Sequence, residues 1–377
     1  MKMGNIQMVD LVGQYKEIKT EIDKAISDVI LSAKFINGPQ VTEFASKLES
    51  YTGAGFVILC ANGTDALQVA MMALKFKPGD EIIVPTFTYV ATVETIALLG
   101  LKPIFVDVDP NTFNIDPSQI EKSITPLTKG IIVVHLFGQA ADMEQIMDIA
   151  KKNNLKVIED TAQAIGCEVI FANGRKKQAG TIGDIGTVSF FPSKNLGCYG
   201  DGGALFTNDK ELSEQIKMIC NHGQKQKYIH DEIGVNSRLD TLQAAVLIEK
   251  LKKLNEYTLR RQKVANYYDE HLSGIANISI PERNEKSTHV FNQYTLKLHK
   301  TDRSAFQDYL KDNGIPTMIY YPLPVHLQKA YLHYGYDAGD YPVAEQLCKE
   351  VVSIPIHTQM DDTMLEFITT KIKEYFK

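Results

Sequence analysis

The chain has 377 residues, 44% of them hydrophobic and 23% charged, with no tryptophan, which is typical of a globular protein large enough for two lobes. Its net charge of −6 and its scattered basic residues exclude the basic patch of a nucleic-acid-binding protein. Five cysteines without CxxC spacing predict neither a disulfide framework nor a metal site, and we expect a cytoplasmic protein, since no apolar run suits a signal peptide or a membrane span.

The first part of the chain predicts two helices, 16–32 and 41–51, separated by the breaker Asn37-Gly38-Pro39. A short apolar strand at 56–60 then leads through a tight turn into an amphipathic helix that ends near residue 74. This strand, turn and helix begin an alternation that continues for about 100 residues.

The middle of the chain alternates strands with helices, which predicts a mostly parallel sheet covered on both faces. The expected strands are 81–84, 103–108, 130–135, 156–159, 185–191 and 204–207, and the expected helices are 89–99, 117–124 and 143–153. Apolar runs such as 131–134 are typical of strands that are buried on both faces.

The last third has a different pattern and predicts a smaller α+β lobe. We expect a long helix at 241–268, a strand at 293–298, and helices at 304–313, 341–351 and 362–375. The predicted division is a large domain at 1–250, which includes the N-terminal helical segment, and a small C-terminal domain at 251–377.

A lysine in the stretch SFFPSKNLGCYGDGG, residues 189–203, is the first candidate for chemistry. Lys194 follows an apolar strand and precedes a glycine-rich loop, where the main chain can approach a ligand closely. A Schiff-base lysine would be useful there. The alternative is a solvated loop lysine.

Three further candidates follow predicted strands, at the edge where open α/β sheets bind ligands. Asn62-Gly63-Thr64 opens a helix and could hold an anion, although ordinary N-capping is the alternative. Asp160 ends a buried strand and needs a partner to offset desolvation: a protonated ring nitrogen, a neighbouring arginine or an N-cap. Gln163 could bind the same ligand, and Tyr89 offers an aromatic plane or core packing.

Taken together, these residues match what pyridoxal 5′-phosphate (PLP) requires of a protein. The cofactor needs an anion site, a stacking aromatic ring, a carboxylate for its pyridinium nitrogen and a lysine. The glycines near Lys194 do not match the dinucleotide-binding G-x-G-x-x-G motif. His135, at a strand end, is interpreted as a hydrogen-bonded structural histidine.

Several long motifs resemble the DegT/DnrJ/EryC1/StrS family of nucleotide-sugar aminotransferases. The resemblance covers nearly the whole chain through the segments NGTDAL (62–67), TYVAT (88–92), EDTAQA (159–164), SFFPSKNLGCYGDGGA (189–204) and GVNSRLDTLQAA (234–245). It implies an α/β protein of the aspartate-aminotransferase fold, fold type I, with a mostly parallel seven-stranded sheet. It also implies a homodimer with shared active sites, L-glutamate as amino donor and a nucleotide-linked keto sugar as acceptor.

The resemblance assigns roles residue by residue. Lys194 resembles the Schiff-base lysine, Asp160 the pyridinium partner and Gln163 a ligand of the phenolic side of the cofactor. The other residues that the resemblance assigns are Tyr89 for stacking, Gly63, Thr64 and Ser189 for the phosphate, Asn236 for the phosphate of the other subunit, and Arg238, Tyr320, Tyr321 and His326 for the substrate. For Tyr320, Tyr321 and His326, packing of the Pro-rich loop is the alternative.

Within the family, the segments 190–204, 221–224 and 234–245 most resemble enzymes that aminate C3 of UDP-2-acetamido-2-deoxy-3-oxo-D-glucuronate in O-antigen synthesis. Arg238 could bind the uronate, the glutamate carboxylate or the pyrophosphate. The alternatives are an aminotransferase for a dTDP-linked 3-keto or 4-keto deoxyhexose, a PLP-dependent sugar dehydratase, and a non-catalytic sensor. The presence of Lys194 disfavours the last two.

Overall fold

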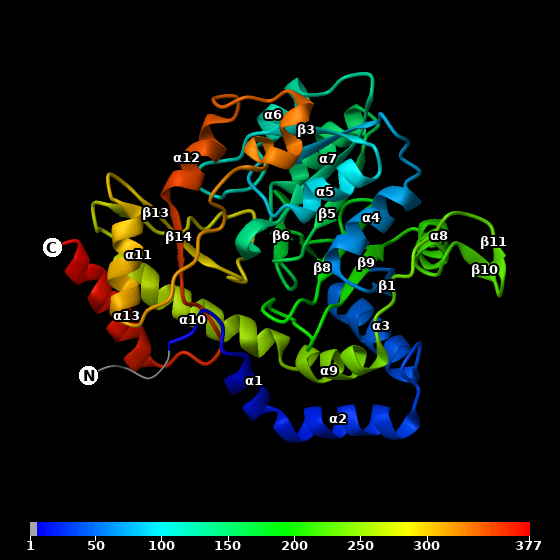
Figure 1. The fold of residues 1–377 in the computed structure, drawn as a ribbon, viewed down its shortest axis with the longest axis horizontal. Helices are drawn as coiled ribbons and strands as arrows, with labels where there is room; N and C mark the ends of the chain where they lie inside the picture. The colour runs from blue at the N-terminus through cyan, green and yellow to red at the C-terminus, as the bar shows by residue number, and fades with distance from the viewer. Residues whose placement is uncertain (1–5) are drawn as a thin grey trace.

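The computed structural model describes residues 6–377, and its centre is a seven-stranded sheet (Figure 1). The strand order is β1-β9-β8-β5-β4-β2-β3, with β9 antiparallel to both of its neighbours and the pairs from β8 to β3 parallel. The strands are β1 Phe56–Cys60, β2 Glu81–Pro85, β3 Lys102–Val106, β4 Thr128–Val134, β5 Lys156–Asp160, β8 Ile185–Ser189 and β9 Gly203–Thr207.

Helices cover both faces of this sheet because successive strand residues point to opposite sides. In β2, Ile82 and Val84 pack in the core formed with α4, α5 and α8, whereas Ile83 packs in the core formed with α7. The helices are α4 Gly63–Ala73, α5 Ala91–Leu98, α6 Pro117–Lys122, α7 Met143–Lys152 and α8 Lys210–Cys220. The predicted doubly covered parallel sheet is thus confirmed, with strand bounds that differ by a few residues.

Helices α3 and α9 pack on one side of the sheet, and the N-terminal helices α1 and α2 lie beyond α9, with α2 packed on it (Figure 1). These helices are α1 Leu11–Glu17, α2 Lys19–Ser32, α3 Pro39–Thr52 and α9 Thr241–Leu251. The prediction of one helix over 16–32 is corrected to the two helices α1 and α2. Ile18 separates them because its backbone (φ −122°, ψ 29°) is not helical.

The C-terminal lobe has its own core around the antiparallel sheet β12-β13-β14. Its elements are α10 Leu254–Leu272, β12 Ile278–Ser279, β13 Tyr294–Leu298, α11 Arg303–Asp312, α12 Pro342–Glu350, β14 Val351–Ile354 and α13 Asp362–Tyr375. The predicted long helix 241–268 is in fact two helices, because Lys252 and Lys253 separate α9 from α10. The helix breaks there because α9 packs on α3 in one core and α10 packs on α13 in the other.

Small elements that the sequence analysis did not predict complete the fold. The hairpin β10–β11 protrudes at the right of Figure 1, beyond α8. These elements are β6 Glu168–Ile170, β7 Lys176–Gln178, β10 Gln224–Gln226, β11 Ile229–His230 and the 3-10 helices Leu136–Gly138, Val325–Leu327 and Lys329–Tyr334. Among residues 6–377, no helix has the length and apolar character needed to cross a membrane. The domain boundary near residue 250 stays a prediction.

Candidate active site

A cavity of about 820 Å³ lies beyond the carboxyl ends of the parallel strands. Val134 ends β4, Asp160 ends β5 and Ser189 ends β8, and all three line it. The turns after β1 and β2 contribute the segments 62–65 and 88–89. The fold therefore brings together residues that lie up to about 260 positions apart, since Tyr320 and Tyr321 of the C-terminal lobe line the same cavity.

Asp160 is a buried carboxylate with two protein donors. The Ala162 N–H donates to its Oδ1 (3.0 Å), and the Thr92 hydroxyl donates to its Oδ2 (3.1 Å). Burial raises the pKa of Asp160, and the Ala162 N–H, the positive charge of Lys194 and the Thr92 hydroxyl only partly oppose this shift. A cationic ring nitrogen in the cavity would therefore stabilise the ionised form of Asp160.

Lys194 lines the same cavity, in the loop that follows β8. Burial lowers its pKa, and the carboxylate of Asp160 opposes this shift. A lowered pKa increases the fraction of neutral amine at pH 7, which is the form that acts as a nucleophile or base. The backbone of Lys194 is held by its own turn, in which the Lys194 N–H donates to Phe191 O (2.9 Å).

A buried pair, Glu159 and His135, holds the backbone of Asp160 in place. Both Glu159 and His135 are completely buried, and His135 Nε2 lies 3.0 Å from Glu159 Oε2. Because His135 Nδ1 accepts from the Ala141 N–H (3.1 Å), the ring proton is on Nε2 and is donated to Glu159. Burial raises the pKa of Glu159, but the hydrogen bonds from His135, Gly183 and Gly180 outweigh it and leave the pKa below its usual value. The backbone N–H of His135 donates to Asp160 O (3.0 Å), so the pair also holds the end of β5.

Gln163, Tyr89 and Tyr321 line the cavity together. Gln163 Oε1 accepts from the Phe137 N–H (2.8 Å), and its Nε2 donates to the Tyr321 hydroxyl (3.1 Å). The Tyr321 ring packs between Phe87 and Tyr89, with centroid distances of 6.0 and 6.3 Å. Tyr89 is 58% exposed, so one face of its ring is free to stack on a ligand.

The N-terminus of α4 also lines the cavity. Asn62 caps this helix, since its Oδ1 accepts from the Asp65 N–H (2.7 Å), and Gly63 and Thr64 line the cavity. First-turn N–H groups have no acceptor within their own helix and suit an anion. Gly63 is required sterically, because a Cβ there would lie 2.7 Å from the Cβ of Ser189.

Three predicted site residues lie outside the cavity lining. His326 is completely buried, with Nδ1 2.7 Å from the Thr86 hydroxyl and Nε2 3.3 Å from Glu345. Its ring packs the Pro-rich loop onto the large lobe, and a contact of His326 with the sugar stays a prediction. Asn236 is exposed and Arg238 half-buried, both in the segment between β11 and α9. The Ser237 hydroxyl from that segment accepts from the Ala61 N–H (3.1 Å), close to the N-terminus of α4.

The cavity also contains residues that the sequence analysis did not assign to the site. They are Asp65, Leu67, Thr88, Ala91, Val134, Ala162, Phe191, Ser193, Asp201, Asn292 and Gln293. Most belong to the motifs already singled out. Asn292 and Gln293 do not, and the only sequence signal for them is a pair of adjacent amides at the start of a predicted strand.

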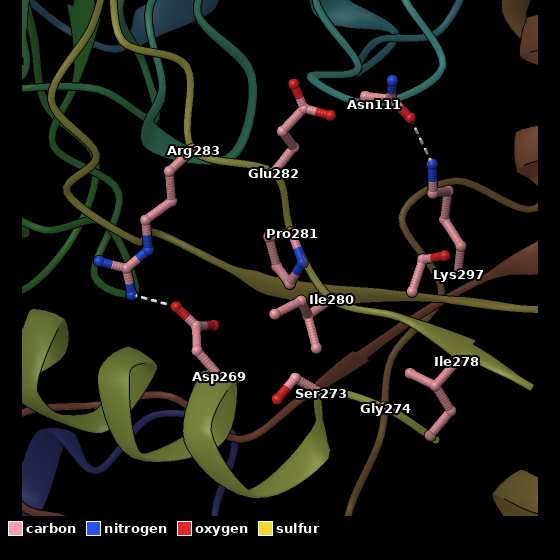
Figure 2. A pocket seen from close by; sticks show the side chains of 11 residues that line it. Asn111, Asp269, Ser273, Gly274, Ile278, Ile280, Pro281, Glu282, Arg283 and Lys297 are labelled. Atoms are coloured by element: carbon pink, nitrogen blue, oxygen red, sulfur yellow. Dashed lines mark hydrogen bonds and ion pairs between the residues drawn. The ribbon is translucent and has the colours of Figure 1, made fainter. Parts of the chain in front are cut away.

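A second pocket of about 510 Å³ lies on the C-terminal lobe and is shown in Figure 2. Its cations already have protein partners, since Arg283 pairs with Asp269 and Lys297 donates to Asn111 Oδ1 (3.1 Å). The cavity with Asp160 and Lys194 is therefore the candidate active site.

Comparison with known proteins identifies relatives that span the chain. A model of the DegT/DnrJ/EryC1/StrS aminotransferase family matches residues 16–373. The chain is 44% identical to the pleiotropic regulatory protein of Geobacillus stearothermophilus, over 99% of each chain. It is 46% identical to the UDP-2-acetamido-2-deoxy-3-oxo-D-glucuronate aminotransferase of Pseudomonas aeruginosa, over 96% of this chain and 98% of that protein.

Solved structures show the same fold. DesV of S. venezuelae superposes with a TM-score of 0.95 at 34% identity, covering 100% of this chain and 99% of DesV. NtdA of Bacillus subtilis, solved with its bound cofactor PMP, has a TM-score of 0.88 at 32% identity, covering 96% of this chain and 82% of NtdA. These comparisons confirm the predicted fold type. The chain therefore belongs to the DegT/DnrJ/EryC1/StrS aminotransferase family, whose members use pyridoxal 5′-phosphate.

Proposed function

We propose that the protein transfers the amino group of L-glutamate to the 3-keto group of UDP-2-acetamido-2-deoxy-3-oxo-D-glucuronate, a step toward surface polysaccharides such as O-antigen. The observation that carries the aminotransferase chemistry is the convergence of Asp160 and Lys194 in one cavity, with burial shifting the two pKa values toward each other. The 46% identity to the Pseudomonas enzyme over nearly the whole chain supports this substrate.

The residues of the cavity fit PLP in charge and in donor chemistry. Asp160 would hold a proton on the ring nitrogen, Lys194 would hold the cofactor covalently, and Gly63, Thr64 and Ser189 would bind its phosphate at the N-terminus of α4. Tyr89 would cover one face of the ring, while Gln163 lies beside Tyr321 on the cavity wall. When bound, PLP supplies an electron sink for the carbon that carries the amino group.

Lys194 has a second role in this proposal, as the base that moves a proton at that carbon. Its lowered pKa suits it for this role, because a general base works best when its pKa lies near the working pH. Asp160, positioned by Thr92 and the Ala162 N–H, keeps the ring nitrogen protonated during the transfer. Tyr320 and Tyr321 would contact the sugar, and Arg238 remains a candidate for the uronate, the donor carboxylate or the pyrophosphate.

We further propose a homodimer, in which Asn236 of one subunit completes the phosphate site of the other. Apolar side chains exposed at the end of α2 and in the loop after it support an interface there, namely Leu31 (82% exposed), Phe35 and Ile36. All five cysteines are buried and unbridged, which fits the proposed cytoplasmic location.

The substrate is tested with a panel of UDP-linked and dTDP-linked amino sugars in the reverse direction, with 2-oxoglutarate as acceptor and keto sugar as readout. We expect the highest kcat/KM for the UDP-linked 3-amino uronate that corresponds to the proposed keto sugar. A preference for a dTDP-linked deoxyamino sugar would overturn the uronate assignment in favour of the deoxyhexose alternative.

Covalent attachment of the cofactor is tested separately. Borohydride reduction of the purified protein followed by peptide mass mapping should find the pyridoxyl group on Lys194. Lys250, a second buried lysine outside the cavity, serves as the internal control and should stay unmodified. A protein that retains no pyridoxyl group under these conditions would contradict the cofactor assignment of Lys194.

A further inference from the structure

The segment 289–293, which leads into β13, is held in place by hydrogen bonds to its backbone. The Val290 N–H donates to Gly138 O (2.9 Å), and the Gln293 N–H donates to Phe137 O (3.3 Å). Asn195, next to the candidate catalytic lysine, donates from Nδ2 to Val290 O (2.9 Å). The segment is thereby fastened both to the loop after β4 and to the loop that carries Lys194.

The conformation of this segment is strained at Phe291, whose φ of +47° lies in the left-handed region that non-glycine residues rarely adopt. Two features hold it there. The buried guanidinium of Arg261 donates from Nη1 to Phe291 O (3.1 Å), and the Phe291 ring stacks on His289 at 3.8 Å with an interplanar angle of 3°. A strained backbone that its surroundings hold so firmly is typical of a segment that positions a functional side chain.

The next residue, Asn292, has a buried polar atom without a hydrogen-bond partner in the described part of the chain. It is only 3% exposed and lines the active-site cavity, yet its side-chain Oδ1 is buried without any hydrogen-bond partner among residues 6–377. Buried side-chain amides are nearly always hydrogen-bonded, because an unpaired buried acceptor is unfavourable. Oδ1 itself is covered in the ligand-free structure, so a group bound in the cavity that Asn292 lines would reach it after the amide rotates about its Cβ–Cγ bond.

We propose that Asn292 is a substrate-positioning residue whose side-chain amide binds a hydroxyl group of the sugar. This inference rests on the proposed function and adds a residue to its sugar site. A hydroxyl fits because one group can both donate to Oδ1 and accept from Nδ2, whereas the ammonium of the amino donor can only donate and its carboxylates can only accept. The neighbouring Gln293 and Tyr320 also line the cavity, and Gln293 would provide a second amide for the sugar.

The test uses Asn292→Leu, which keeps the approximate shape and removes both polar groups. With the UDP-linked 3-amino uronate and 2-oxoglutarate as the substrate pair, KM for the sugar should rise about tenfold, in proportion to one lost hydrogen bond. KM for 2-oxoglutarate should change less than twofold. Because Oδ1 has no partner in the ligand-free protein, the Tm without sugar should stay the same or rise.

Two further comparisons keep the result interpretable. Asn292→Ser and Asn292→Ala leave cavities of similar size and differ by one hydroxyl, so KM for the sugar should be at least about threefold higher in the alanine variant. Gln178→Leu is the matched control, since Gln178 Oε1 is also buried and unpartnered but lies outside the cavity, and its KM values should not change.

An unchanged sugar KM in the leucine variant, an equal rise for both substrates, or equal KM values for the serine and alanine variants would overturn the role of Asn292. If the wild-type protein turns over no UDP-linked or dTDP-linked amino sugar at all, the proposed function fails instead. The two failures are therefore distinguishable.

Discussion

At the scale of single residues, the active site depends on charges that are buried but not fully compensated by the protein. Asp160 has two donors and a raised pKa, while Glu159, one residue earlier, accepts four hydrogen bonds and has a lowered pKa. The two adjacent carboxylates point to opposite sides of β5, because side chains alternate along a strand. One is left available to a ligand in the cavity, and the other stabilises the fold.

Asp160→Asn removes the negative charge with little change of shape. We expect kcat to fall at least about 100-fold, because the ring nitrogen would lose the carboxylate that keeps it protonated. The measurement is steady-state turnover of the purified protein, with cofactor content determined by absorbance. Asp184→Asn is the control, since Asp184 also accepts from a backbone N–H, that of Val157, but does not line the cavity. Wild-type turnover in the Asp160 variant would remove its assigned role.

Lys250 gives a prediction for pH dependence. It is 2% exposed, and its Nζ donates to Gly197 O (2.5 Å) in the loop after Lys194. Burial lowers its pKa from the usual 10.5 to about 8. Between these two values the unfolded chain keeps the proton that the folded protein has released, so stability rises with pH in this window and is independent of this group below it.

The free energy of unfolding of the wild-type protein relative to Lys250→Met should therefore increase between pH 7 and pH 9.5. The increase should reach about 2 kcal/mol at most, at ~1.4 kcal/mol per pH unit. Denaturant unfolding at the two pH values measures it. Lys252→Met is the control, because Lys252 lies two residues further along the chain and its side chain is exposed. This variant should show no such change. A difference that shrinks with rising pH would contradict a buried, easily deprotonated Lys250.

At the scale of elements, the N-terminus of α4 has both a structural and a proposed binding role. Asn62 stabilises the helix as its N-cap, while the adjacent first turn lines the cavity. Helix α6 has a comparable cap in Asp116, whose Oδ1 accepts from the Ser118 N–H (2.9 Å), but it does not line the cavity. Substitutions of Asn62 and Asp116 therefore distinguish the effect of losing an N-cap from an effect on cofactor binding.

Asn62→Ala and Asp116→Ala should each lower the free energy of unfolding of the cofactor-free protein by about 1 kcal/mol, the usual effect of losing an N-cap. Only Asn62→Ala should also weaken cofactor binding, because the first turn of α4 would lose its fixed geometry. Unfolding curves and PLP titrations measure the two effects. Equal PLP affinity in both variants would argue against the phosphate site at α4.

At the scale of the whole molecule, the proposed dimer predicts that charges placed on the apolar end of α2 prevent association. Leu31→Asp combined with Ile36→Asp should convert the protein to a monomer at micromolar concentration, as measured by sedimentation velocity, because buried carboxylates without partners are costly. Leu259→Asp, on a leucine of α10 that is 66% exposed, is the control and should leave the assembly unchanged. A dimeric double variant would place the interface elsewhere.

The sequence by itself determined the order and type of most elements, since apolar periodicity and strand ends are local signals. It also pointed to Lys194, Asp160, Gln163, Tyr89, Gly63, Thr64 and Ser189, because these residues follow strands or belong to long motifs, and all of them line one cavity. Tertiary structure decided what depends on contacts between distant segments. The chain breaks at Lys252 because α9 and α10 pack in different cores. The burial of His326 against Thr86 and the unpartnered Oδ1 of Asn292 depend on contacts between distant segments, which no local pattern records.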